Sequence, residues 1–96
     1  MKVPEILVKL SELSLPSGDY VVHSSASLVL RGILEDAGDL DIVAHGTAWQ
    51  VSLALVAAGE AALDEGREDS RVSVGDQVEI YNGWLGEDAE AVVSRA

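Results

Sequence analysis

Apolar residues recur along the chain with two different spacings, one typical of helices and the other typical of strands. Segments of the two kinds alternate, so helices and strands are predicted to alternate. Residues 3–13 predict a helix, because Pro4 suits a first turn and the apolar side chains recur at helical spacing. Those side chains are Ile6, Leu7, Leu10 and Leu13. A short β-type run at residues 20–22 predicts a buried strand. Residues 24–36 predict a second helix directly after it, with Gly32 inside the helix as a sign of close packing on a sheet.

The second half of the chain predicts further strands. Residues 39–44 alternate polar and apolar as a strand does, and Thr47 has capping-box spacing to Gln50, which predicts a third helix from Thr47 through Ala58. The acidic stretch 60–70 predicts a solvated loop with a short strand at residues 61–63. The remaining signals are a hairpin across Gly75–Asp76 joining residues 71–74 to 77–81, a turn at residues 82–84, and a short terminal helix marked by Ala89, Val92 and Val93.

Early alternation of helices and strands, followed by a hairpin, predicts one α/β (α+β) domain over residues 1–96, with a mixed sheet flanked by helices. Seventeen Asp and Glu against six Lys and Arg leave a net charge of −11, which disfavours general nucleic-acid binding. The chain has no cysteine, and no apolar run is long enough to span a bilayer. The expected partners therefore include no membrane, and the expected compartment is the cytoplasm.

Two acidic side chains carry the most informative pattern. Asp39 and Asp41 lie two residues apart in the predicted strand, so both carboxylates are expected on one face of the sheet. Neighbouring carboxylates repel each other, and oxygen ligands of this kind suit Mg²⁺ or Mn²⁺. The alternative interpretation is a pair of solvated strand residues.

A predicted strand that runs directly into a helix start suits phosphate binding. The first N–H groups of a helix are free to bind an anion, and the hydroxyls of Ser24 and Ser25 would add further donors to such a site. The alternative is that Ser24 is only an N-cap. Arg31 is the nearest cation in the sequence, and a helical ion pair with Glu35 competes with any role in ligand binding.

These motifs together resemble the core of the nucleotidyltransferase superfamily, which has the polymerase-β-like fold. The matching segments are SSASLVLRGI at residues 24–33, GDLDIV at residues 38–43 and VEIYNGW at residues 78–84. The resemblance is closest to small bacterial nucleotidyltransferase-like proteins. It implies that Ser25 contacts the nucleotide phosphates, with Ser24 at the family's glycine position. It also implies that Asp39 and Asp41 bind metal and that Glu79 is the third carboxylate, either a general base or a further ligand.

Two hypotheses of function follow. The first is a minimal enzyme that uses Mg²⁺ to transfer a nucleoside monophosphate from an NTP to a hydroxyl acceptor. The second is a catalytically silent module of the same fold that binds a protein through its acidic surface, as in toxin–antitoxin or phage–host systems. The serine at the family's glycine position and the small size of the domain favour the second; the combined motifs favour the first. A homodimer that completes the cleft is a further expectation.

Overall fold

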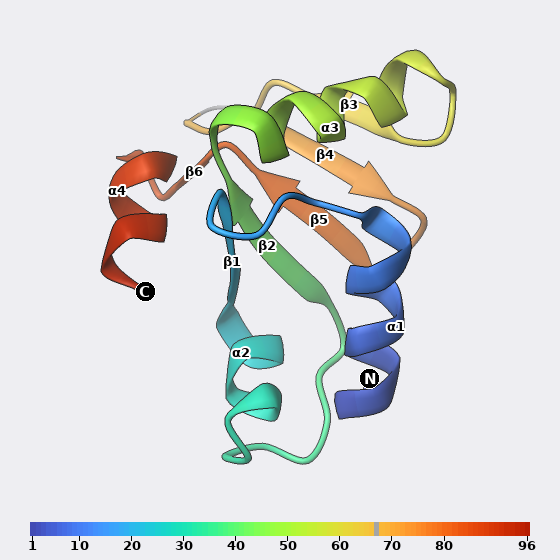
Figure 1. The fold of residues 1–96 in the computed structure, drawn as a ribbon, viewed down its shortest axis with the longest axis vertical. Helices are drawn as coiled ribbons and strands as arrows, with labels where there is room; N and C mark the ends of the chain where they lie inside the picture. Colours follow the sequence, from blue (N-terminus) through green and yellow to red (C-terminus); the bar gives the residue numbers. More distant parts are fainter. Residues whose placement is uncertain (67) are drawn as a thin grey trace.

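A mixed five-stranded sheet lies at the centre of the protein (Figure 1). The structure is a computed structural model that describes residues 1–66 and 68–96. The strands, in their order across the sheet, are β1 (Tyr20–His23), β2 (Leu40–Ala44), β5 (Val78–Tyr81), β4 (Arg71–Val74) and β3 (Ala62–Asp64). β2 and β5 run parallel, and every other neighbouring pair in this sheet is antiparallel. The predicted mixed α/β fold is therefore confirmed.

Four helices and a small second sheet complete the chain. The helices are α1 (Val3–Leu13), α2 (Ser24–Leu30), α3 (Gly46–Ala57) and α4 (Ala89–Arg95), and the second sheet pairs β6 (Gly83–Trp84) with β7 (Glu87–Asp88). The boundaries of α1 agree with the predicted helix, and those of α3 lie one residue before the predicted ones. No helix in the described part of the chain is long and apolar enough to cross a membrane.

Each face of the sheet packs against different helices. One face buries Leu40, Ile42 and Ile80 in a cluster that takes in side chains of α1, α2 and α3. On the other face, Val43 packs against Ala89 and Val92 of α4, with Val21 and Trp84 at the margin. This second cluster is small, so the rest of that face carries polar side chains, and the candidate site lies there.

The second helix is shorter than predicted. α2 ends at Leu30 because Gly32 adopts a left-handed conformation with φ 76°. The N–H groups of Gly32 and Ile33 then donate to the carbonyls of Val29 and Leu28, at 3.0 and 2.9 Å, which is the Schellman pattern of a helix end. A Cβ on Gly32 would meet no atom within 4 Å, so the prediction that this glycine marks close packing on the sheet is wrong.

The start of α3 is also set differently from the prediction. The N-cap residue is His45, and its side chain makes no cap hydrogen bond. Instead, Oδ2 of the distant Asp19 accepts from the N–H of Thr47 at 3.2 Å, while the Asp19 carbonyl accepts from the N–H of His45 at 2.9 Å. The loop before β1 therefore caps α3. The sequence had predicted a different cap, a capping box formed by Thr47 and Gln50.

Three other predicted boundaries change. Asp39 lies just before β2 and not within it. The predicted turn at residues 82–84 becomes β6, and the chain reverses after it at Leu85 and Gly86, both of which have positive φ. The short strand expected at residues 61–63 is β3, one residue later. The predicted hairpin is confirmed, but its turn also includes Gln77, because Val74 pairs with Val78.

The capping role of Asp19 can be tested against that of Thr47. Asp19→Ala should lower the free energy of unfolding by about 1 kcal/mol, because it leaves a helix N–H without its acceptor. Thr47→Ala should change it by less than about 0.5 kcal/mol, since the Thr47 side chain caps nothing. Urea unfolding followed by circular dichroism measures both, and equal losses would contradict the assignment.

Candidate functional site

A row of polar side chains crosses the sheet on the face that α4 only partly covers. His23 of β1 lies opposite Asp41 of β2, Asp41 lies opposite Glu79 of β5, and Glu79 lies opposite Ser73 of β4. Directly opposed residues of neighbouring strands point to the same face of a sheet. Strand pairing therefore sets two of the three predicted carboxylates side by side, although they are 38 positions apart in the sequence.

The third predicted carboxylate is placed less firmly. Asp39 is exposed and precedes the strand, yet its charge is close enough to influence Asp41. Within residues 1–66 and 68–96, no three Asp, Glu or His side chains converge closely enough to hold a metal ion as they stand. Asp41 and Glu79 have the hard oxygen donors that Mg²⁺ prefers, so the donor chemistry fits while Asp39 would have to approach.

Glu79 is held in place by two neighbours on the same face. Its Oε2 accepts from the hydroxyl of Tyr81 and from Nη1 of Arg71 at 3.4 Å, and Nη2 of Arg71 reaches Asp64 at 2.9 Å. Burial and the hydrogen bond to Glu79 raise the pKa of Tyr81 to about 12, so the phenol stays protonated as a donor. This arrangement fixes one carboxylate oxygen of Glu79; no described residue donates a hydrogen bond to the other.

Asp41 has no such compensation. It forms no ion pair with any described residue. Partial burial, followed by the negative charges of Glu79 and Asp39, raises the pKa of its carboxyl, and His23 acts weakly in the opposite direction. Asp41 is therefore a carboxylate whose charge the protein leaves unbalanced.

The predicted phosphate site adjoins this row. α2 begins at Ser24, directly after His23, which is the partner of Asp41. Ser24 has φ 56°, a left-handed conformation that favours glycine, and the resemblance puts the family's glycine at this position. The hydroxyls of Ser24 and Ser25 make no hydrogen bond to any described residue, so neither acts as a side-chain cap. The helix has only seven residues, so its dipole adds little to an anion site.

Arg31 lies at the opposite end of α2 from the two serines. The predicted alternative, an ion pair with Glu35, is wrong, because the helix ends before Glu35 and Arg31 pairs with no described carboxylate. Ser24, Ser25 and Arg31 nevertheless line one cleft of about 640 Å³ beside β1. His23 belongs to both regions, since it lines this cleft and is part of the polar row.

His23 stacks on Trp84 between the cleft and the carboxylates. The two ring centroids are 4.4 Å apart, and Trp84 also meets Tyr81 edge-on at 5.2 Å. The Nδ1 atom of His23 is buried and has no hydrogen-bond partner among the described residues. The residue opposite Asp41 therefore carries a buried ring nitrogen that has no hydrogen bond. Buried polar atoms in folded proteins are usually hydrogen-bonded, so this arrangement is unusual for a purely structural residue.

Sequence reasoning missed the residues that support Glu79. Tyr81 was expected on the same face as Glu79 but without a bond to it, and Arg71 was assigned only to a strand of the hairpin. A two-residue turn at Gly75–Asp76 would set Arg71 opposite Ile80, whereas the observed register sets it opposite Tyr81. Strand alternation puts Tyr81 and Glu79 on one face, so the sequence carried a signal for Tyr81, whereas the position of Arg71 depends on the register of the folded hairpin. Comparison with family models, curated proteins and solved structures finds no match for this chain.

The unbalanced charge of Asp41 predicts a change in stability with pH. A carboxyl whose folded pKa lies above its ordinary value of 3.8 favours the folded state at low pH, and this stability is lost as the pH rises through the folded pKa. Asp41→Asn should therefore raise the free energy of unfolding at neutral pH by about 0.5 kcal/mol after solvent screening. The gain should vanish near pH 3, where the wild-type carboxyl is also neutral.

Urea unfolding at the two pH values measures this difference. Asp76→Asn is the matched control, because Asp76 is exposed in the hairpin turn and forms no ion pair with any described residue. A loss of stability in Asp41→Asn at neutral pH would show that the carboxylate is satisfied by the fold.

Proposed function

We propose that the protein is a minimal nucleotidyltransferase that transfers a nucleoside monophosphate from an NTP to a hydroxyl acceptor. The observation that carries this proposal is the strand register, which sets Asp41 beside Glu79 and brings the start of α2 next to both. Ser24 and Ser25 contact the phosphates, and Arg31 adds the nearest cation on the same cleft. The cytoplasm, where NTPs are made and used, is the proposed compartment.

In the proposed reaction, the acceptor oxygen forms a bond to the α-phosphorus, the bond to the bridging oxygen breaks, and pyrophosphate leaves. Glu79 takes the proton of the acceptor hydroxyl, while Tyr81 and Arg71 keep its carboxylate oriented. Asp39, Asp41 and Glu79 would hold Mg²⁺ or Mn²⁺, which neutralises the charge that develops on the phosphates.

The electrostatics of Asp41 support a cation at this place. A carboxylate that is partly buried, next to two others and without a cationic partner is costly to ionise. A divalent ion removes that cost, so the energy stored in the repulsion contributes to metal affinity. Natural proteins often retain such unfavourable charges where function needs them.

Thermal stability tests the enzyme hypothesis directly. Mg²⁺ and an NTP added together, at about 100 times the dissociation constant, should stabilise the protein by about 2.7 kcal/mol and raise Tm by roughly 10 °C. Asp41→Asn should erase this shift, and Asp76→Asn should keep it. An unchanged Tm at millimolar nucleotide with Mg²⁺ would refute the proposal.

A second candidate is a silent module that binds a basic protein through its acidic surface. The observation that favours it is the engagement of Glu79 by Arg71 and Tyr81, together with the lack of three converged metal ligands among the described residues. Both features suit a fold that has lost metal binding. The net charge of −11 would then attract the partner.

This second candidate predicts a complex that weakens steeply with salt, because exposed charges are screened beyond about 10 Å at 0.1 M ionic strength. A pull-down from the native host at low salt, followed by elution at about 0.5 M salt, should recover a basic protein. Binding should be equal for wild type and Asp41→Asn. If no partner is recovered, or if Asp41→Asn alone abolishes recovery, the module hypothesis loses its support.

A further inference from the structure

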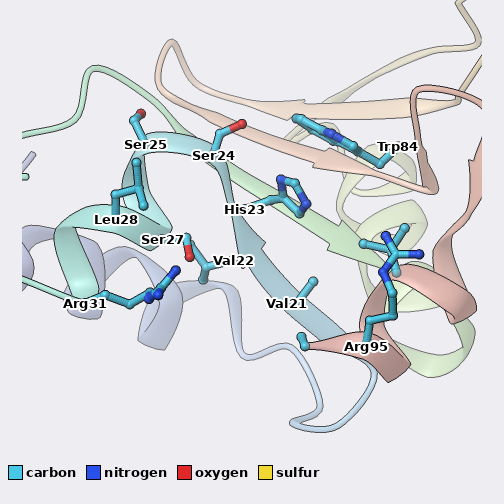
Figure 2. Close-up of a pocket in the computed structure, with 12 residues that line it drawn as sticks. Val21, Val22, His23, Ser24, Ser25, Ser27, Leu28, Arg31, Trp84 and Arg95 are labelled. Atoms are coloured by element: carbon cyan, nitrogen blue, oxygen red, sulfur yellow. The ribbon is translucent and has the colours of Figure 1, made fainter. Parts of the chain in front are cut away.

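The outer edge of β1 lies open in the cleft. β1 is the last strand of the five-stranded sheet, so no strand of the described part of the chain pairs with its outer side. The cleft of about 640 Å³ follows this strand and is walled by α2 on one side and α4 on the other (Figure 2). An unpaired strand edge is a ready template for another extended segment.

The lining residues show that the cleft reaches the backbone itself. Val22 packs into the cluster beneath α1, α2 and α3, whereas Val21 packs into the α4 cluster on the opposite face. Both residues nevertheless line the same cleft. A cleft that touches side chains of both faces opens on the edge between them.

The hydrogen-bond pattern identifies which backbone groups are free. In an antiparallel pair, only alternate residues bond to the partner strand. The N–H of His45 donates to the carbonyl of Asp19 at 2.9 Å, and this pair continues the β1–β2 register. Val21 and His23 therefore bond to β2, and the N–H and C=O of Val22 point outward into the cleft.

The charge of the cleft differs from that of the molecule. Of its described lining residues, none is Asp or Glu, although the chain has seventeen of them. Arg31 on the α2 wall has no carboxylate partner among the described residues, while Arg95 on the α4 wall pairs with Glu87. Leu28 and Val92 add apolar side chains to the two walls, next to the serines at the start of α2. The cleft thus offers both apolar and hydroxyl-bearing side chains, with one cation, Arg31, that no described carboxylate pairs.

We propose that the outer edge of β1 binds an extended acidic peptide segment of a partner protein as a sixth strand of the sheet. One peptide residue forms two backbone hydrogen bonds with Val22, a neighbouring acidic side chain pairs with Arg31, and apolar side chains contact Leu28 and Val92. A second copy of this chain is a poorer occupant. Its β1, Tyr20–His23, has no acidic side chain to pair with Arg31, and Asp64 of its other edge strand, β3, already pairs with Arg71. The proposal needs neither a metal ion nor the carboxylate row.

The test uses two blocked hexapeptides, in which valine alternates with either glutamate or lysine, and the ¹⁵N-labelled full chain in EDTA. The acidic peptide should shift the Val22 amide resonance and slow its hydrogen exchange, and the basic peptide should do neither. Arg31→Gln should weaken binding roughly five- to tenfold through the lost charge pair. Lys9→Gln, which removes a cation on α1 away from this cleft, should have no effect.

Val22→Pro tests the backbone contact separately. Proline is tolerated on an edge strand where the N–H faces outward, so the variant should fold and lose peptide binding. If Val22→Pro does not fold, the Arg31→Gln result still decides the proposal. Three results would overturn it: no binding of the acidic peptide at about 1 mM, equal binding of both peptides, or a dimer in light scattering whose Val22 amide is already protected.

Discussion

The parallel pairing of β2 with β5 is the constraint on which the rest of the structure depends. It joins strands separated by α3, β3 and β4, and it fixes Leu40 against Val78 and Ile42 against Ile80. These apolar residues fill one face of the sheet and form the main core. Because side chains alternate along a strand, the same register sets Asp41 against Glu79 on the other face. A slip of one residue would lose both the core and the carboxylate pair.

The polar row persists because the opposite face supplies the stability. The main cluster contains most of the buried apolar residues, whereas the α4 cluster contains three. Burial on one face lets the other keep charges that repel each other. Asp41 illustrates this, since its carboxyl is disfavoured as an anion and yet remains at the centre of the sheet. Glu79 differs because Arg71 and Tyr81 balance it.

Two regions of opposite electrostatic character lie on either side of the His23–Trp84 stack. Asp41 and Glu79 form an anionic region on one side, and the cleft beside β1 carries an uncompensated cation on the other. The stack contacts both regions, because His23 pairs with Asp41 and both rings line the cleft. The carboxylates on the interior strands β2 and β5 suit a cation, and the open edge of β1 suits an acidic segment, which would compete with the NTP phosphates proposed for the same cleft.

Most element types, the faces of the main strands and the presence of the hairpin follow from the sequence alone, but the hairpin register that sets Arg71 opposite Tyr81 does not. The first three depend on local periodicity and turn chemistry, which act over a few residues. The sequence alone also did not determine the end of α2, the capping of α3 by Asp19, or the meeting of Asp41 with Glu79. Each of these depends on backbone conformation or on contacts between segments far apart in the chain. Such contacts form only when the whole core packs. Closing the loops between distant strands costs entropy, and only the burial of apolar side chains in the complete core offsets that cost.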